Sequence, residues 1–416
     1  MKVLHTADIH IGYETYGRPD PKTGLNTRLL DFKRSFDFMV QCAIDENVDA
    51  FLFCGDAYRT HDPTPTHQKV FAECLRPLAS AGIPMVMITG NHDQPVSFGK
   101  ASSIDIFRHL VGDVYVFDAP ELKEIPTKSG LLQIAALPWP IRSKILATEE
   151  HRNKSGADLR AFIEEKYVDW VKYLAENKLN PALPAILAAH LTVQGADMSG
   201  SERSSLIQHE PTFMVGQLAN PAFDYVALGH IHRHQDRNAG YRPPVVYSSS
   251  IERINFKEAG DEKGFVIVDI HPHPTEARRE TTYRFVPTPA RRFIAIHIQA
   301  KDASDPMGKI LDTIARHDLT DAIVRVRYEI DEQQVKAIDQ QAIRAALADA
   351  DFIAAIERTV DVKQVQRSST VTREMSLQAA MEAYVERREN LKPLKEELVS
   401  AALHLEEALE AEERGR

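Results

Sequence analysis

The chain has 416 residues, 43% of them hydrophobic and 26% charged, and a formal net charge of −10 at pH 7. This length predicts two or three domains, and the composition is typical of a globular protein. The acidic balance argues against a surface that binds nucleic acid throughout, although it allows a local basic groove. No apolar run reaches the ~20 residues that cross a bilayer, so we expect no membrane contact. The three cysteines have no CxxC spacing, which favours reduced thiols and a cytoplasmic location.

The N-terminal part of the chain alternates short apolar segments with amphipathic segments of helical period, which predicts a β-α-β-α-β unit. A short polar cluster follows each predicted strand directly. In open α/β sheets ligands bind at the carboxyl ends of the strands, so we expect the site at this edge. The predicted strands are Lys2–Ala7, Ala50–Cys54 and Pro84–Thr89, and the predicted helices begin at Asn26 and Thr66.

The region that follows, up to Val286, is richer in strand-like segments. With the N-terminal unit it predicts an α/β (α+β) fold, a two-sheet β-sandwich flanked by helices. We expect the last three strands to run antiparallel. The predicted strands are Val114–Phe117, Leu131–Leu137, Ala185–Ala189, Tyr225–Leu228, Val245–Ser248, Gly264–Ile270 and Thr282–Val286, and the predicted helix is Asp158–Asn177.

The composition divides the rest of the chain. A predicted linker, Pro287-Thr288-Pro289, ends a first domain of residues 1–286. Residues 290–365 alternate strand-like and helix-like segments and predict a small α+β domain. Residues 370–416 are rich in Glu, Lys, Ala and Leu and predict two amphipathic helices separated near Pro393. Such helices at the end of a chain usually pack on another surface.

Five polar clusters at predicted strand ends supply carboxylates, an amide and several imidazoles. Mixed oxygen and nitrogen ligands suit Mn²⁺, Fe²⁺ or Zn²⁺ better than an all-oxygen Mg²⁺ site. One such cluster alone is often a structural turn, and a lone histidine is often a core residue, but the shared context predicts a pair of divalent metals. The clusters are Asp8-Ile9-His10, Gly55-Asp56, Gly90-Asn91-His92-Asp93, His190 and Gly229-His230-Ile231-His232.

The residues of the third cluster divide between metal and substrate. The Asn91 carbonyl can complete a metal shell, whereas the adjacent His92 cannot easily bind the same metal. We therefore predict that His92 acts on the substrate and that Asp93 holds its imidazole in one tautomer. In the last cluster, His230 and His232 are predicted to lie on one side of an extended segment.

The order DxH, GD, GNHD, H, GHxH is similar to the signature of the calcineurin-like metallophosphoesterase superfamily, and other segments resemble its SbcD-type DNA exonuclease subunits. One departure is the run Ser248-Ser249-Ser250, where members often carry a glycine, so the shape of that loop is left open. The segments that carry the resemblance are Thr6–Gly12, Gly55–Tyr58, Asp62–Pro65, Gly90–Asp93, Gly229–His232, Tyr247–Arg253 and Glu262–Phe265.

The resemblance implies a role for each residue of the site. Two divalent ions, Mn²⁺ first and Mg²⁺ as the alternative, would be bridged by Asp56. His92 would contact the scissile phosphate and assist the leaving oxygen. Asp8, His10 and His232 would hold one ion, and Asn91, His190 and His230 the other.

The resemblance also implies a metal-dependent DNA nuclease, a double-strand exonuclease and single-strand or hairpin endonuclease, acting in DNA end processing and repair. Its partners would be DNA and an SbcC-type ABC ATPase, with a homodimer inside a heterotetramer. Residues 290–365 would form a capping domain that contacts DNA. Residues 370–416 would bind the coiled coil of the ATPase, or else pack on their own domain or self-associate. A candidate DNA-binding patch, or alternatively a set of solvated surface arginines, consists of Arg278, Arg279, Arg284, Arg291 and Arg292.

Two other functions fit the same motifs. One is a small-molecule phosphatase or phosphodiesterase, and the other is a non-catalytic scaffold that binds DNA ends. The long extension after Val286, which a small-molecule phosphatase would not require, favours the nuclease over the first. The complete set of expected ligands favours it over the second.

Overall fold

The computed structural model describes residues 1–95, 99–109, 112–141, 155–200, 202, 210–273, 279–361, 375–386, 388 and 391–414. The chain forms two compact units. The first comprises Met1–Glu329 and Ala337–Thr359, and the second comprises Ile330–Lys336 and Val360–Arg416.

The first unit contains a six-stranded sheet in the order β14-β13-β1-β2-β3-β4. Strands β1 to β4 are parallel, whereas β13 runs antiparallel to β1 and β14 antiparallel to β13. The first three polar clusters follow the carboxyl ends of the parallel strands β1, β2 and β3. The bounds are β1 (Lys2–Thr6), β2 (Ala50–Phe53), β3 (Met85–Ile88), β4 (Val114–Phe117), β13 (Gly264–Pro272) and β14 (Arg279–Pro287).

A second six-stranded sheet has the order β11-β12-β10-β7-β6-β5. Its four central strands, β12, β10, β7 and β6, are parallel. The prediction that Val245–Ser248 belongs to an antiparallel tail is therefore wrong, because β12 pairs in parallel with β10. The bounds are β5 (Glu121–Thr127), β6 (Gly130–Leu137), β7 (Ala185–His190), β10 (Tyr225–Gly229), β11 (Gln235–Asp236) and β12 (Val245–Tyr247), beside a small pair β8 (Thr192–Val193) and β9 (Thr212–Phe213).

Strand β5 is missing from the sequence prediction. Its segment alternates poorly, since Glu121, Lys123 and Glu124 are all exposed and Pro126 lies inside it. Charged residues and proline are typical of strands at the edge of a sheet, where β5 lies. An edge strand therefore lacks the apolar signal by which the central strands are recognised.

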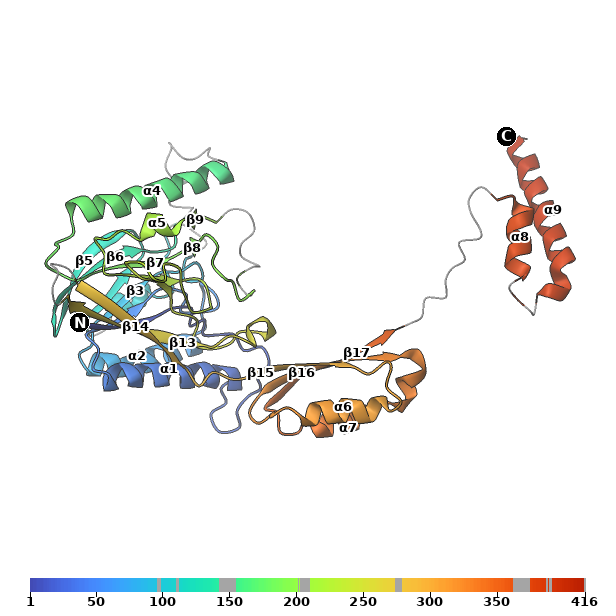
Figure 1. The fold of residues 1–416 in the computed structure, drawn as a ribbon, viewed down its shortest axis with the longest axis horizontal. Helices are drawn as coiled ribbons and strands as arrows, with labels where there is room; N and C mark the ends of the chain where they lie inside the picture. Colours follow the sequence, from blue (N-terminus) through green and yellow to red (C-terminus); the bar gives the residue numbers. More distant parts are fainter. Residues whose placement is uncertain are drawn as a thin grey trace. The chain divides into compact units, whose positions relative to one another are not determined.

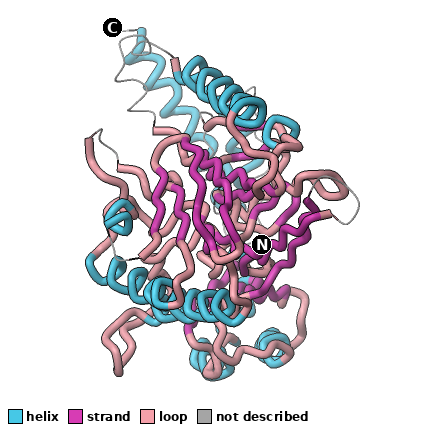
Figure 2. The backbone as a smooth tube through the Cα atoms, turned by 90° about the vertical axis from the view of Figure 1, so that its left-hand side faces the viewer, coloured by secondary structure: helices cyan, strands magenta, loops and turns pink. Residues whose placement is uncertain are grey.

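The two sheets pack face to face, as Figure 1 and Figure 2 show. Their shared core contains Leu52 and Val86 from the first sheet and Ile186 and Ala227 from the second. Helices α1 and α2 cover the outer face of the first sheet, and α4 covers that of the second. The predicted fold class, a two-sheet sandwich flanked by helices, is confirmed. The helices of this region are α1 (Thr27–Asp45), α2 (Pro65–Ser80), α4 (Gly156–Asn177) and α5 (Val215–Leu218), with short turns η1 (Asp105–His109) and η3 (Phe256–Glu258).

Polar residues define where the long helices begin. The side chain of Asn26 accepts the N–H of Arg28 at the start of α1, and the side chain of Thr64 accepts that of His67 at the start of α2. Each satisfies one of the N–H groups that a helix leaves unpaired at its first turn. The predicted helix starts at Asn26 and Thr66 therefore lie within a residue of the observed ones.

The chain then forms a three-stranded sheet in the order β15-β16-β17. Helices α6 and α7 follow β15 and β16 in the sequence, and the C-terminal segment contains two further helices, α8 and α9, that pack against each other. Within the described residues, no helix is both long and apolar enough to cross a membrane. The bounds are β15 (Phe293–Gln299), α6 (Pro306–Ala315), β16 (Ile323–Asp331), η4 (Glu332–Ala337), α7 (Gln340–Ala346), β17 (Phe352–Asp361), α8 (Leu377–Glu386), η5 (Lys392–Leu394) and α9 (Lys395–Arg414).

Candidate metal centre

The predicted ligands meet at the carboxyl edge of the two sheets. The loops after β1, β2 and β10 place four of them in backbone conformations with positive φ: Asp8 (54°), His10 (52°), Asp56 (63°) and His230 (96°). Such conformations cost roughly 1–3 kcal/mol each in non-glycine residues and persist where the surrounding structure enforces them. Their concentration at one place marks a functional site.

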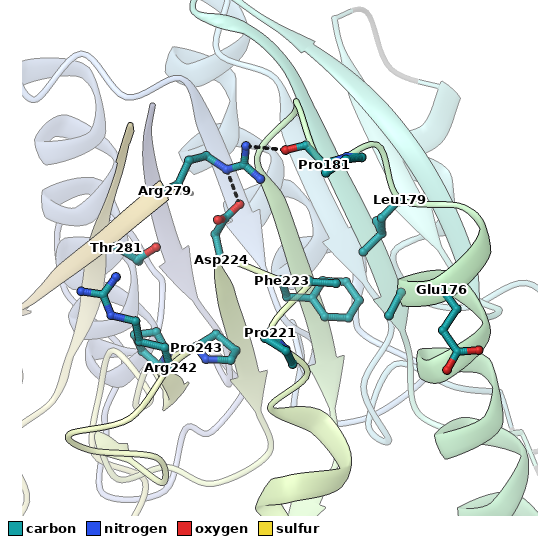
Figure 3. Close-up of a pocket in the computed structure, with 13 residues that line it drawn as sticks. Glu176, Leu179, Pro181, Pro221, Phe223, Asp224, Arg242, Pro243, Arg279 and Thr281 are labelled. Atoms are coloured by element: carbon teal, nitrogen blue, oxygen red, sulfur yellow. Dashed lines mark hydrogen bonds and ion pairs between the residues drawn. The ribbon is translucent and has the colours of Figure 1, made fainter. Parts of the chain in front are cut away.

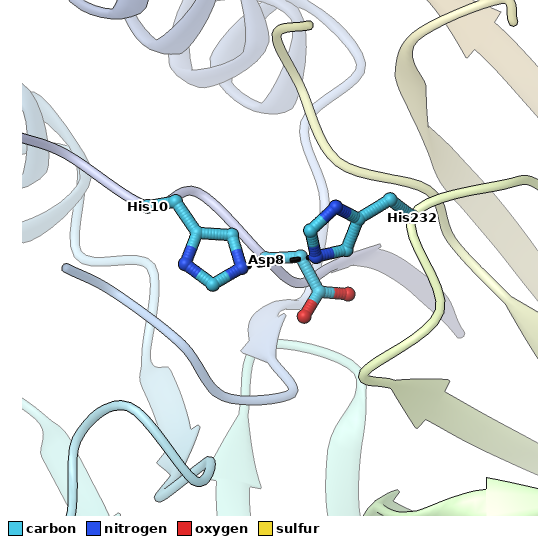
Figure 4. Close-up of side chains that lie close together, drawn as sticks. All are labelled: Asp8, His10 and His232. Atoms are coloured by element: carbon cyan, nitrogen blue, oxygen red, sulfur yellow. Dashed lines mark hydrogen bonds between the residues drawn. The ribbon is translucent and has the colours of Figure 1, made fainter. Parts of the chain in front are cut away.

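Asp8, His10 and His232 form the first group. One ligand atom from each lies within 4.8 Å of the others. The Nε2 atoms of His10 and His232 lie 3.0 Å apart. Figure 4 shows the two rings turned toward each other next to Asp8. All three side chains are buried. These atoms converge on one point, which is the arrangement that a shared cation requires.

Asn91, His190 and His230 form the second group. The Asn91 Oδ1 lies 3.0 Å from His190 Nε2 and 3.2 Å from His230 Nδ1. Asp56 stands between the two groups, since its Oδ2 is 3.5 Å from His190 Nε2 and 3.6 Å from His10 Nε2. The structure thus brings together all seven predicted metal ligands.

The donor set fits divalent metal ions. Asp8 and Asp56 expose 1% and 2% of their surface, and imidazoles lie next to both. Buried carboxylates are stable only when a cation or several hydrogen bonds compensate for the lost hydration. Mixed carboxylate, amide and imidazole donors favour Mn²⁺, Fe²⁺ or Zn²⁺.

The protonation of each of these groups depends on its charged neighbours. Burial opposes ionisation of Asp56, but His190 and His92 outweigh it and hold its pKa well below the usual range. Burial lowers the pKa of His190, but Asp56 outweighs this effect and raises it to about 9. For His232, burial again lowers the pKa, and Glu258 outweighs it and raises it to about 9. A metal must therefore displace protons from both histidines.

Further residues orient the ligands. The Cys54 carbonyl lies 2.7 Å from His190 Nδ1, and Glu258 Oε1 lies 3.0 Å from His232 Nδ1. Lys263, which is fully buried, contacts the other Glu258 oxygen at 3.0 Å. Contacts of this kind fix the ring and tautomer of a metal-binding histidine. The sequence indicates the segment of Lys263 through its resemblance, but no local motif reveals the role of Glu258.

The predicted pairing of Asp93 with the His92 imidazole is wrong. Asp93 instead accepts the backbone N–H groups of Asp56, Ala57 and Gly90 at 2.7, 3.0 and 2.9 Å. The His92 Nδ1 lies 2.7 Å from the carbonyl of Arg59, which takes over the orienting role. Three N–H groups satisfy the carboxylate where one imidazole was predicted, because the turn after β2 directs those of Asp56 and Ala57 at it and the loop after β3 adds that of Gly90.

The last cluster also differs from its prediction. Because His230 has a φ of 96°, the segment is not extended there. His230 consequently contacts Asn91, whereas His232 contacts His10 in the other group. The two histidines thus belong to different ligand groups and do not lie on one face of a strand.

A sequence profile of the calcineurin-like phosphoesterases matches residues 1–234, which include all the predicted ligands. The chain belongs to this family. The phosphoesterase is 31% identical over 277 residues to the SbcD subunit of the SbcCD nuclease from Bacillus subtilis, covering 65% of this chain and 67% of that protein. It is 26% identical over 271 residues to the protein of the same name from Escherichia coli (strain K12), covering 63% of each. The match to the DNA double-strand break repair protein Mre11 of Archaeoglobus fulgidus is 24% over 405 residues, covering 89% of this chain and 78% of that one.

These matches confirm the predicted resemblance. The phosphoesterase spans about two thirds of the length of the two bacterial relatives. The names of those two relatives describe a nuclease subunit, and that of the archaeal relative describes a repair protein.

Ser249 lies in the run of serines whose loop shape the sequence left open. It has a φ of 88°, a conformation that glycine adopts without strain. Its hydroxyl lies 2.9 Å from the carbonyl oxygen of His232 and 3.1 Å from that of Ser250. These hydrogen bonds, which glycine could not make, offset the strain of the positive φ at Ser249.

The four described arginines of the predicted patch are not free cations. Arg278 lies outside the described residues. The other four each pair with a carboxylate, and the buried pair of Arg291 with Asp31 is clearly structural. Of the four described arginines, Arg284 and Arg292 are the most exposed, at about half of each side chain, and are the best placed to release an acidic partner and meet a phosphate. The pairs are Arg279–Asp224, Arg284–Glu46, Arg291–Asp31 and Arg292–Asp318.

A separate pocket of 480 Å³ lies away from the ligands (Figure 3). Phe223 and Asp224 line it just before β10, and Pro243 and Pro244 line it just before β12. It therefore opens at the amino ends of these strands, opposite the metal edge. None of the predicted metal ligands lines this pocket.

Proposed function

We propose that this phosphoesterase is a metal-dependent DNA nuclease that hydrolyses phosphodiester bonds with two divalent ions. Mn²⁺ is the preferred ion and Mg²⁺ the alternative. The proposal rests on the position of Asp56 Oδ2, which lies between the His10 and His190 rings. A single oxygen shared by two ligand groups suits a bridged pair of metals. The SbcCD relatives are named as a nuclease subunit and the Mre11 relative as a DNA double-strand break repair protein, which together support DNA as the substrate.

Seven residues would hold the two ions and leave His92 for the substrate. When bound, such ions neutralise the phosphate oxygens and acidify a coordinated water. His92 also lies within ligand reach of His10 and Asp56, so its assignment to the substrate is part of the proposal. Because its Nδ1 is engaged by the Arg59 carbonyl, Nε2 is the atom left to meet the phosphate. A cationic His92 would pass the Nε2 proton to the departing ester oxygen.

One assay separates the candidate functions. The purified chain is incubated with end-labelled linear duplex, a hairpin and p-nitrophenyl phosphate esters, each with Mn²⁺, Mg²⁺ or a chelator. We expect Mn²⁺-dependent shortening of the duplex and opening of the hairpin. Hydrolysis of the small esters alone would indicate a small-molecule phosphoesterase. Binding of DNA without cleavage under any metal would indicate a scaffold.

The proposal includes a complex with an SbcC-type ATPase that contains a coiled coil, arranged as a homodimer within a heterotetramer. Within the second unit, Tyr384, Leu394 and Leu405 expose 46%, 44% and 65% of their surfaces. Large apolar side chains exposed on a helical pair are typical of a surface that a partner helix covers. Residues 370–416 would form this surface, residues 1–286 the nuclease domain and residues 290–365 a cap that contacts DNA.

Co-purification tests the partner. The Leu405→Asp variant should lose co-purification with the ATPase, as should a chain truncated after residue 369. The control Glu406→Ala changes the neighbouring exposed residue and should leave the complex intact. Retention of the complex by the truncated chain would reject this surface, while nuclease activity of the isolated chain is measured separately.

A further inference from the structure

Trp139 lies beside the second ligand group and has no role in the proposed mechanism. It follows β6 within the segment Pro138-Trp139-Pro140. Its backbone N–H donates to the Thr89 carbonyl at 2.9 Å, directly before the loop that carries Asn91 and His92. A proline on each side restricts the backbone, so the indole is held in place before any substrate binds.

The indole packs on the histidines of one group only. Its ring centroid lies 5.1 Å from that of His230 at an interplanar angle of 37°, and 6.0 Å from that of His190 at 74°. His92, in contrast, lies against His10, with ring centroids 4.9 Å apart. Trp139 and His92 thus flank the two ligand groups from opposite ends.

Exposure shows where a substrate enters. The carboxylate and imidazole ligands are buried, whereas Asn91, His92 and Trp139 remain partly exposed. The open side of the site therefore presents an imidazole at one end and an indole at the other. A phosphate held between them would carry one of its two ester substituents toward Trp139.

We propose that Trp139 stacks on a nucleobase, the one attached to the scissile phosphate on the side of His190 and His230. This inference rests on the proposed nuclease function and names a base-binding subsite within it. An indole offers a flat π-surface to any base, so such a subsite binds DNA without selecting its sequence. A packing role alone would instead require only the bulk of the side chain against His230.

The test combines Trp139 variants with abasic DNA. Oligonucleotides carry a tetrahydrofuran residue on one or the other side of the cleaved phosphate. For the native chain with Mn²⁺, we expect the abasic residue on one side alone to raise KM on the order of 10-fold, as loss of one stacked base does. The Trp139→Ala variant should show the same rise in KM on intact DNA and no further rise on abasic DNA.

Three further variants separate stacking from packing. Trp139→Phe should keep a KM on intact DNA close to that of the native chain. Trp139→Leu, which retains bulk without a ring, should show the raised KM of Trp139→Ala. Trp170→Phe, in α4, should behave like the native chain. Mn²⁺ binding by isothermal titration should be unchanged in the Leu and Phe variants.

The outcomes are distinct. Failure of the native chain to cut any DNA would refute the nuclease function itself. Cleavage by the native chain that ignores both abasic positions would overturn the stacking subsite alone, as would native KM values in Trp139→Leu. Loss of Mn²⁺ from Trp139→Leu but not Trp139→Phe would assign the indole to ligand positioning and also overturn it.

Discussion

The Asp93 carboxylate accepts the backbone N–H of Asp56 at 2.7 Å, while Asp56 Oδ1 accepts the backbone N–H of His92 at 2.8 Å. The loop after β2 and the loop after β3 are thereby joined through two carboxylates. The predicted bridging ligand, Asp56, and the predicted substrate residue, His92, are therefore positioned by one pair of linked hydrogen bonds. A change in Asp93 should therefore disturb both.

Asp93→Asn should destabilise the protein by roughly 3 kcal/mol, because an amide replaces a carboxylate that accepts three buried N–H groups. Thermal unfolding of the metal-free protein measures this loss. Ser103→Ala removes only a 3.3 Å contact to the same carboxylate and should cost far less. Equal losses in the two variants would contradict the central role of Asp93.

His92→Asn should abolish nuclease turnover and leave two metal ions bound, because its ring is assigned to the substrate. Elemental analysis of the purified variant together with the duplex assay gives both readouts. Asp56→Ala is the comparison, and it should lose metal as well as turnover. Metal loss from His92→Asn would instead make His92 a ligand, in line with its distance from Asp56.

Glu258→Gln should weaken metal binding ~10–100-fold, the usual effect of removing a carboxylate that orients a ligand histidine. It also leaves buried Lys263 without its 3.0 Å carboxylate partner. Titration with Mn²⁺ measures the affinity, and Glu262→Gln, at an exposed position, serves as the matched control. Native affinity in Glu258→Gln would show that the Glu258 charge does not matter to His232.

His5 makes stability depend on pH away from the metals. Burial lowers its pKa from 6.5 to about 3, and its ring nitrogens contact the Tyr225 hydroxyl and the Leu228 carbonyl. The unfolded chain binds a proton below pH 6.5 and the folded chain does not, so stability is complete above that pH and falls as the pH drops toward 3. At about 1.4 kcal/mol per pH unit, the loss by pH 5 is roughly 2 kcal/mol.

Denaturant unfolding at pH 7 and pH 5 tests this linkage. His5→Gln should show a smaller loss between the two values than the native chain, whatever its stability at pH 7. His271→Gln changes a histidine that is 60% exposed and should retain the native pH dependence. An unchanged pH dependence in His5→Gln would exclude His5 as the source.

The ligands could be found in the sequence because each follows a short apolar strand, and parallel strands bring their carboxyl ends to one edge. Asp8, Asp56 and His190 were recognisable for that reason. The orienting contacts were not, because they join residues distant in sequence. The Cys54 carbonyl and His190 are 136 residues apart, and Arg291 and Asp31 are 260 apart.

Local backbone geometry was the second limit. The left-handed conformations of His230 and Ser249 depend on how the surrounding loops pack, and neither histidine nor serine requires such a conformation. His230 was therefore predicted to lie in an extended segment. The arginines near the linker were predicted to form a patch because acidic partners such as Asp31, in α1, and Asp224, just before β10, are distant in the sequence.

The ligand groups draw on both layers of the sandwich, since Asp8 and Asp56 follow strands of one sheet and His190 and His230 end or follow strands of the other. Ions bound there would cross-link the two halves of the core at their common edge. Binding to the folded chain alone adds about 2.7 kcal/mol of stability per site at a free-ion concentration 100 times the dissociation constant. The free-ion concentration would thus set the free energy of unfolding of the enzyme as well as its activity.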